Sequence, residues 1–227
     1  MGIHSVLDRP APSTDAEAPT PLTTDASTAI GLASRAEWRA REHVALHGLW
    51  DADVESALAD EARRSRLRAS GPAAGPAQRT ASGRPGDRST LIASGPVLQQ
   101  LHLELAGLAR RLTGQALVPT FAAYYYYQDD DEVRLHLDTE DCDLTMITEA
   151  LGPLGPLHLH PELVGRTTEE LTALEADPTW DRWSGLPITH PRRGVTAFRG
   201  RRIPHHRPGC LLDGLGAVAA LHYRTRY

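Results

Sequence analysis

The first half of the chain carries apolar residues at helical spacing. One helix is predicted over about 51–67, where the apolar positions recur every four residues: Val54, Leu58 and Ala62. Another is predicted over about 96–112 and is ended by Gly114. Its core face is a row of leucines: Leu98, Leu101, Leu105 and Leu108. We therefore expect two amphipathic helices.

An earlier helix is predicted by Ser34 and Glu37, which have the spacing of a capping box. It would end near Gly48, and its apolar residues would be Trp38, Val44 and Leu46. Residues 1–30 are rich in Pro, Thr, Ser, Ala and Asp, so we expect a disordered tail. Residues 70–89 form a Gly/Pro/Ser-rich loop, which we expect to be mobile or functional, for example as a lid.

From Ala116 onward the pattern changes to short strands. LVPTFAAYYYYQ (117–128) is aromatic and β-branched, and QDDDE (128–132) after it predicts a turn. Further strands are expected at VRLHLD (133–138), DLTMITEAL (143–151), GVTAFRG (194–200) and GAVAALHYR (216–224). A second capping box, from Thr167 to Glu170, predicts a short helix.

This order of elements favours one fold class. Helices occupy about 35–113 and strands about 116–227, without the strand–helix alternation of a parallel sheet. We therefore predict an α+β protein with an antiparallel β-sandwich or barrel. The length of 227 residues fits a single domain, here over 31–227.

Composition and charge exclude several classes of function. The net charge of −5 argues against a nucleic-acid binder, because phosphate contacts need a basic surface, although it leaves room for a small anionic ligand. Neither a run of about 18 apolar residues nor a secretory signal is present, so we expect no membrane partner and a cytoplasmic location. The two cysteines, Cys142 and Cys210, are expected to be reduced and buried.

The strand VRLHLD raises a chemical question. His136 and Asp138 are two residues apart and point to the same face, about 6.6 Å apart along the strand, while Val133, Leu135 and Leu137 point to the other. A buried carboxylate needs a cation, a metal ion or several donors. The pair could hold a metal, or it could lie on the solvated face of an edge strand.

A distant segment, FRGRRIPHHRPG (198–209), favours the metal. It supplies His205 five residues after Gly200. Two ligands from one strand and one imidazole from another make a 2-His-1-carboxylate triad, which holds Fe(II) and leaves positions open for other ligands. His206 is the alternative to His205, and adjacent strand residues face opposite ways, so only one of them would bind.

These segments, together with YYYYQDDDEVRLHLDTEDCDLTMI and AVAALHYR, resemble the iron(II)/2-oxoglutarate-dependent oxygenases over about half of the chain. The resemblance implies a double-stranded β-helix (jelly roll) preceded by helices. It implies His136, Asp138 and His205 as ligands of Fe(II), with 2-oxoglutarate and O₂ as cosubstrates. It also implies oxidation of an unactivated C–H with release of succinate and CO₂. Family halogenases lack the carboxylate ligand, so Asp138 favours hydroxylation, desaturation, epoxidation or ring closure.

The chain departs from the family at the 2-oxoglutarate anchor. Family members place a basic residue about ten positions after the distal histidine, but here that window reads Leu-Gly-Ala (215–217). Arg207 and Arg224 are the two candidate substitutes. Tyr124 and Tyr126 on one face of their strand, or Tyr125 and Tyr127 on the other, could add a hydroxyl.

Other residues leave further possibilities open. His158 and His160 form another same-face pair, for a substrate rim, a structural role or a rival metal site with His190. We expect a small amino-acid-like or natural-product substrate. A non-catalytic, cupin-like metal- or ligand-binding β-sandwich is the alternative function, and it would need no oxoacid.

Overall fold

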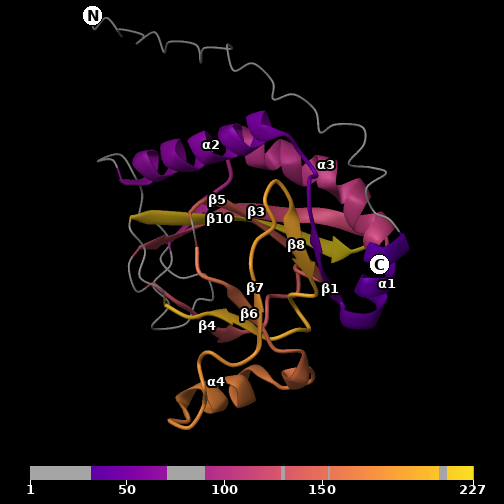
Figure 1. Ribbon diagram of the computed structural model, residues 1–227, viewed down its shortest axis with the longest axis vertical. Helices are drawn as coiled ribbons and strands as arrows, with labels where there is room; N and C mark the ends of the chain where they lie inside the picture. Colours follow the sequence, from indigo (N-terminus) through magenta and orange to yellow (C-terminus); the bar gives the residue numbers. More distant parts are fainter. Residues whose placement is uncertain (1–31, 71–89, 129–130, 153, 210–213, 227) are drawn as a thin grey trace, which may run out of the picture.

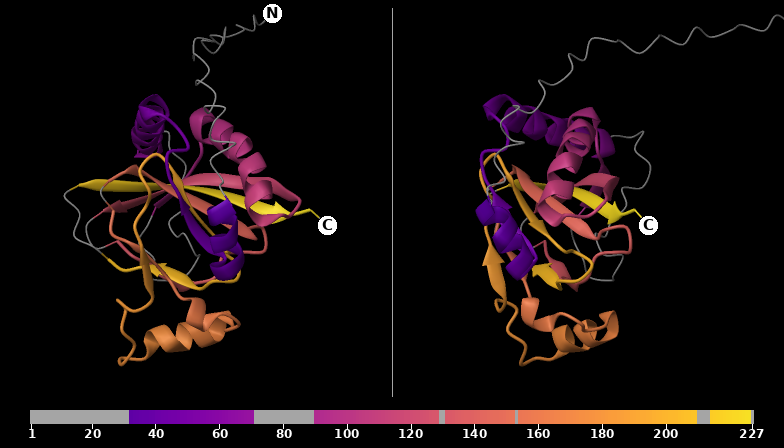
Figure 2. Two further views of the ribbon diagram at one scale, coloured as in Figure 1. Left: turned by 45° about the vertical axis from the view of Figure 1, so that its right-hand side comes forward. Right: turned by 90° about the vertical axis from the view of Figure 1, so that its right-hand side faces the viewer.

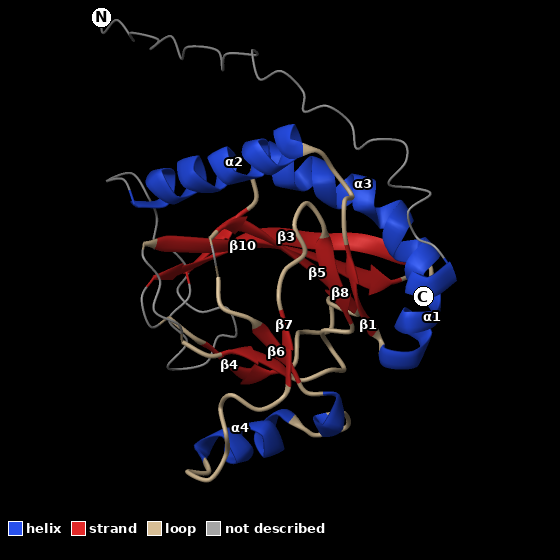
Figure 3. Cartoon of the chain, in the orientation of Figure 1, coloured by secondary structure: helices blue, strands red, loops and turns tan. Residues whose placement is uncertain are grey.

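The computed structural model describes residues 32–70, 90–128, 131–152, 154–209 and 214–226, and these form two antiparallel β-sheets with helices (Figures 1 and 3). The larger sheet has the strand order β1-β8-β5-β10-β3-β2 and the smaller one β4-β9-β6-β7. The larger sheet consists of β1 (His43–Leu46), β2 (Thr90–Ala93), β3 (Leu117–Gln128), β5 (Leu144–Leu151), β8 (Val195–Phe198) and β10 (Leu215–Thr225). The smaller sheet consists of β4 (Val133–His136), β6 (Leu157–Leu159), β7 (Leu186–Ile188) and β9 (His205–Arg207). The predicted α+β class with antiparallel strands is confirmed.

The helices lie on the outer sides of the two sheets. Helices α2 (Ala52–Ser70) and α3 (Pro96–Thr113) cover the larger sheet on the face turned away from the smaller one, and α4 (Thr168–Ala176) lies beyond the smaller sheet (Figure 2). One hydrophobic cluster joins α2 and α3 to the larger sheet, and a second fills part of the space between the sheets. The second cluster is the smaller, which leaves the space between the sheets available for polar groups.

Local signals explain where three helices begin and end. The Asp51 side chain accepts backbone N–H bonds from Asp53 and Val54 at the start of α2. Gly114 ends α3 in a left-handed conformation, as predicted. The capping box at Thr167 is present at the start of α4, with both of its hydrogen bonds formed.

The prediction for the first helix is partly wrong. Helix α1 (Leu32–Arg41) already includes the expected capping box, and it stops seven residues before Gly48. Glu42 has a φ of 58°, which no helical residue adopts, so the helix cannot continue. The following residues, HVAL, form β1 beside β8, because an alternating segment with a β-branched residue fits a sheet edge.

Some expectations fall outside the described residues. These are the tail 1–30, residues 71–89 of the loop and Cys210. Cys142 is described, and it is a buried free thiol. None of the described helices is both long and apolar enough to cross a membrane.

Candidate active site

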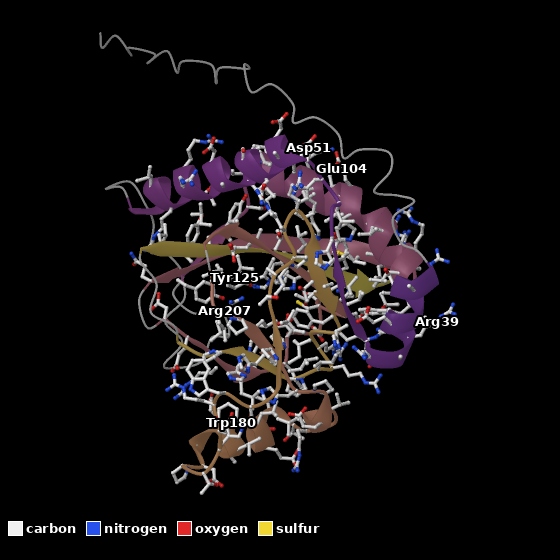
Figure 4. All side chains as sticks on the ribbon, in the orientation of Figure 1. Arg39, Asp51, Glu104, Tyr125, Trp180 and Arg207 are labelled. Atoms are coloured by element: carbon white, nitrogen blue, oxygen red, sulfur yellow. The ribbon has the colours of Figure 1, made fainter. Side chains whose placement is uncertain are left out.

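A cavity opens between the two sheets, and both sheets line it. Figure 4 shows Tyr125 and Arg207 in the space between them. The cavity has an apolar part formed by Tyr125, Tyr127, Val133, Ile147, Leu157, Phe198, Val218 and Ala220. Its polar part is formed by His136, Asp138, Thr145, His205, Arg207 and His222. The predicted iron ligands therefore lie in one cavity.

The structure brings His136, Asp138 and His205 together as a preformed group. Antiparallel pairing of β4 and β9 sets His136 opposite His205. The Nε2 atoms of these histidines lie 3.6 Å and 3.5 Å from the same Asp138 carboxylate oxygen. Their Nδ1–H groups donate to the backbone carbonyls of Arg134 and Ile203, at 2.7 Å and 2.9 Å. Both Nε2 atoms are thereby left as acceptors that face a shared space, as metal ligands are.

One detail of the strand prediction is wrong. Val133 lines the same cavity as His136 and Asp138, although strict alternation would put it on the other face. The register between β4 and β9 shifts between Val133 and His136. A bulge inserts one residue and so reverses the alternation before it, which a sequence pattern alone does not reveal.

Asp138 is held from a second side by residues that the sequence did not single out. The Thr145 hydroxyl donates to its other carboxylate oxygen at 2.5 Å. Because the hydroxyl proton is used in that bond, the Thr145 oxygen is the acceptor in its contact with His222. Nδ1–H of His222, 3.2 Å away, is then the donor. A Cβ at Gly200 would collide with both Asp138 and Thr145, so the glycine before the distal histidine is needed for this close approach.

Burial and charge set the protonation of the group. Burial, and then the charge of His136, lower the pKa of His205, so this imidazole is neutral and free to bind a cation. Burial alone would raise the pKa of Asp138, but His205 and His136 hold it well below its usual range. An ionised carboxylate beside imidazole nitrogens is the donor set of a divalent metal site.

Arg207 lies in the same cavity and is almost completely buried, at 1% exposure. It donates to the carbonyl of Gly155 and to Nε2 of His190, which is 2.7 Å away, and its guanidinium lies 5.2 Å from the centre of the Tyr127 ring. Burial, together with Arg207, lowers the pKa of His190 to about 3, so this neighbour is neutral. Nε of Arg207 is buried without a hydrogen-bond partner among the described residues.

Three other predicted anchor residues face away from the cavity, so those expectations are not met. Arg224 is half exposed and donates to Asp141 at 2.7 Å, outside the cavity lining. Tyr124 and Tyr126 project toward α2, where their hydroxyls donate to Glu61 and to the Ala62 carbonyl. The even-numbered face of β3 packs on the helices, and the odd-numbered face, with Tyr125 and Tyr127, lines the cavity.

His206 turns away from the cavity, as adjacent strand residues must. It meets His160 on the other face of the smaller sheet, at 3.0 Å between ring nitrogens. The rival grouping of His158 and His160 with His190 is not formed, because His190 pairs with Arg207 instead. No signal in the sequence indicates that Thr145 contacts Asp138. The sequence also does not show which residue His206 meets on the outer face of the smaller sheet.

Comparison with known proteins supports the same fold. No protein-family model and no curated protein matches the chain. Among solved structures, the non-heme alpha ketoglutarate dependent epimerase SnoN from nogalamycin biosynthesis is 17% identical, with a TM-score of 0.65 over 85% of this chain and 82% of that one. EctD from S. alaskensis, solved with 2-oxoglutarate and 5-hydroxyectoine, is 22% identical, with a TM-score of 0.64 over 94% and 82%.

HygX from Streptomyces hygroscopicus, solved with nickel and 2-oxoglutarate, is 13% identical, with a TM-score of 0.63 over 88% of each chain. These identities are low, so the likeness concerns the arrangement of the chain rather than its chemistry. The protein has the fold that is shared by these 2-oxoglutarate-binding proteins and the epimerase SnoN.

Proposed function

We propose that the protein is an Fe(II)/2-oxoglutarate-dependent oxygenase that oxidises an unactivated C–H of a small amino-acid-like or natural-product substrate. We take its two sheets to be the two halves of a double-stranded β-helix. The observation that carries the proposal is a metal-ligand triad in the same cavity as a buried arginine, which forms no salt bridge within the described part of the chain.

The residues present fit a bound iron ion. His136, Asp138 and His205 offer two imidazole nitrogens and a carboxylate oxygen within 4.8 Å of one another. This 2-His-1-carboxylate set is the one that non-haem iron enzymes use, and it leaves coordination positions open. Thr145 and the two backbone carbonyls fix the direction of each ligand.

The residues also fit a dicarboxylate. A buried guanidinium without a counter-ion is costly, and the partners of Arg207 among the described residues, His190 and the Gly155 carbonyl, carry no negative charge. Arg207 stands two residues from His205 on β9, so its side chain lies about one dicarboxylate length from the metal group. Its unpartnered Nε–H offers a further donor to a carboxylate. We assign Arg207 as the anchor of 2-oxoglutarate.

Bound iron would supply the oxidising chemistry, in which 2-oxoglutarate and O₂ give succinate and CO₂ as a substrate C–H is oxidised. The chain itself orients the reactants and keeps water out. The apolar side chains of Ile147, Phe198 and Val218 shield the cavity beside the metal group. Asp138 fills one ligand position, which favours C–H oxidation without halogen transfer.

We propose the class of substrate from the proteins whose structures are similar. SnoN is described as an epimerase and SnoK as a carbocyclase, both from nogalamycin biosynthesis, and another similar structure is a prolyl-4-hydroxylase. We propose hydroxylation, with ring closure or another oxidation of the same C–H type as variants of one mechanism. We expect the enzyme to work in the cytoplasm on a small molecule, without a nucleic-acid partner.

The first test is an anaerobic titration. Fe(II) and then 2-oxoglutarate are added, and the visible charge-transfer band of a chelated oxoacid is recorded. We expect the band in the wild-type protein, no band in Asp138→Ala, and a band that needs far more 2-oxoglutarate in Arg207→Gln. Arg224→Gln is the matched control, because this arginine is half exposed and bonded to Asp141.

The same titration distinguishes the oxygenase from the alternative function. A non-catalytic, cupin-like metal-binding protein would take up iron through the triad but would show no band with 2-oxoglutarate and no O₂-dependent succinate. Equal 2-oxoglutarate dependence in the Arg207 and Arg224 variants would remove the assigned anchor.

A further inference from the structure

Three histidines gather on the face of the smaller sheet that is turned away from the cavity. His158 and His160 flank Leu159 on β6 and its end, and His206 lies on β9, directly opposite His158 in the register. All three are buried, at 4%, 1% and 3% exposure. The segment that leads from α4 to β7 covers them, with Trp180 against two of the rings. The oxygenase chemistry proposed above uses none of these side chains.

The separations of the His158 and His160 rings from the His206 ring match those of ligands around one ion. The ring of His206 lies 5.1 Å from that of His158 and 5.0 Å from that of His160, measured between centres. Two imidazoles on one tetrahedral zinc ion, each with a Zn–N bond of about 2.0–2.1 Å, have ring centres roughly 5.2 Å apart. The facing nitrogens of His160 and His206 are 3.0 Å apart, and about 3.3 Å is expected in such a site.

Each ring is held from behind by an oxygen acceptor. Nδ1–H of His158 donates to the Ser184 carbonyl at 2.8 Å, and Nε2–H of His206 donates to the Arg182 carbonyl at 2.7 Å. Nδ1 of His160 lies 2.7 Å from the Glu162 carboxylate. Metal-binding histidines show this arrangement, in which the second nitrogen donates to a carbonyl or carboxylate and so fixes the ring.

His158 and His206 each present a nitrogen without a proton on the other side of the ring. With Nε2–H of His206 given to a carbonyl, its Nδ1 is a bare acceptor, and Nε2 of His158 is bare for the same reason. Nε2 of His158 is buried without a hydrogen-bond partner in the described part of the chain. A buried acceptor without a partner destabilises the fold by about 1–3 kcal/mol. Either a proton on His160 or a metal ion occupies the contact between His160 and His206, and a metal ion there would also satisfy Nε2 of His158.

We propose that this cluster is a second metal site, which binds Zn²⁺ through Nε2 of His158, Nε2 of His160 and Nδ1 of His206. Three imidazole nitrogens suit zinc, and water would complete a tetrahedron. The three nitrogens do not all lie within 4.8 Å of one another, so an imidazole turns inward when the ion enters. Gly185, with a φ of 89°, leaves no room for a Cβ against the His160 ring and so lets the covering segment close over the site.

The ion would act on structure rather than on catalysis. It would tie β6 to β9, the strand that carries His205 and Arg207 on its other face. It would also fix the covering segment, which begins at the end of α4. Helix α4 is itself linked to β4, because the Leu135 N–H donates to the Glu175 carboxylate at 2.9 Å. Zinc would therefore stabilise the smaller sheet, which supplies two of the iron ligands and the anchor.

The test uses the full chain with the cavity site removed, so that its result does not depend on the oxygenase proposal. The double variant His136→Ala/Asp138→Ala is stripped with a chelator, and Zn²⁺ uptake is measured by equilibrium dialysis with elemental analysis. We expect one Zn²⁺ per chain, and a tetrahedral visible spectrum when Co²⁺ replaces it. Further change of His158, His160 or His206 to Gln should abolish uptake. His47→Gln is the matched control, since His47 is exposed.

A variant that fails to fold would not leave the question open. Glu162→Gln alters only the acceptor behind His160, at a half-exposed position, and should weaken Zn²⁺ binding about 10–100-fold. X-ray absorption of the zinc-loaded double variant should show three imidazole ligands. If the double variant takes up no Zn²⁺, a proton alone holds the cluster and the proposal is wrong. Uptake that Glu162→Gln leaves unchanged, with fewer than three imidazoles around the zinc, would overturn it as well.

Discussion

Strand β9 carries a histidine on each of its two faces, and each histidine donates one ring N–H to a backbone carbonyl. Toward the cavity, Nδ1–H of His205 donates to the Ile203 carbonyl, and Nε2 faces Asp138. On the outer face, Nε2–H of His206 donates to the Arg182 carbonyl, and Nδ1 faces His160. In both places a backbone carbonyl fixes the tautomer, so the other ring nitrogen is an acceptor that suits a metal ion. The orientation of each imidazole therefore depends on the carbonyl that accepts from one ring nitrogen as well as on the group that the other nitrogen faces.

The difference between the two faces lies in what surrounds the ligands. The inner set contains a carboxylate, borders a cavity and has the buried guanidinium of Arg207 in the same cavity. The outer set contains only imidazoles and is closed over by tryptophan and backbone. A reactive metal needs open positions for its cosubstrate, whereas the proposed outer ion would be shielded from substrate by the covering segment. If both proposals hold, one strand serves catalysis on one side and structural stability on the other.

The largest expected effect is from Asp138→Ala. This change removes the only carboxylate ligand and breaks the inner set, so Fe(II) affinity should fall by more than the ~10–100-fold that loss of an outer-shell partner costs. Succinate formation should disappear, while Zn²⁺ uptake by the outer cluster should persist. Metal analysis of the variant loaded with each ion checks both statements. Loss of both metals together would mean that the two faces are not independent.

The next effect is from Arg207→Gln, which should raise the KM for 2-oxoglutarate. Truncating one partner of a buried charged pair costs roughly 2–5 kcal/mol. Fe(II) binding should remain, because Arg207 is not a ligand of the metal group. Steady-state succinate assays at varied 2-oxoglutarate give the KM, and Arg224→Gln should match wild type. An unchanged KM in the Arg207 variant would show that another residue anchors the cosubstrate.

A smaller effect is expected from Thr145→Val. This nearly isosteric change removes the 2.5 Å hydrogen bond to Asp138 and should weaken Fe(II) binding about 10–100-fold. Thr196→Val is the control, because the hydroxyl of Thr196 is buried without a partner among the described residues. Anaerobic titration with Fe(II) compares the two. If both valine variants bind iron equally well, Thr145 does not position the carboxylate.

The sequence predicts the inner face far better than the outer one. The spacing of His136, Asp138 and His205 carries a chemical signature, and the structure brings these three together. The same period-two argument sends His206 outward, but it cannot say which residues it meets there. That depends on the register between β6 and β9 and on a covering segment more than twenty residues away in the chain.

The tyrosine strand shows the same limit. Composition predicts β3 correctly, and alternation divides its tyrosines into two pairs, yet nothing in the pattern says which pair faces the cavity. The decision comes from α2, whose Glu61 and Ala62 carbonyl accept the hydroxyls of Tyr124 and Tyr126. In the same way, Glu42 ends α1 through a backbone angle that residue type does not reveal.

The smallest expected effect separates the two faces of β3. The Tyr124 hydroxyl donates to Glu61 at 2.9 Å, and Glu61 also accepts the backbone N–H groups of Val97 and Leu98 at the start of α3. Tyr124→Phe leaves this buried carboxylate one donor short, so the free energy of unfolding should fall by about 1–2 kcal/mol. The KM for 2-oxoglutarate should not change, because the hydroxyl points away from the cavity.

Tyr125→Phe, on the cavity face, should keep the free energy of unfolding within about 0.5 kcal/mol of wild type. Urea denaturation measures the stability of both variants, and the opposite ranking would mean that the cavity face of β3, rather than its helix face, holds the sheet in place.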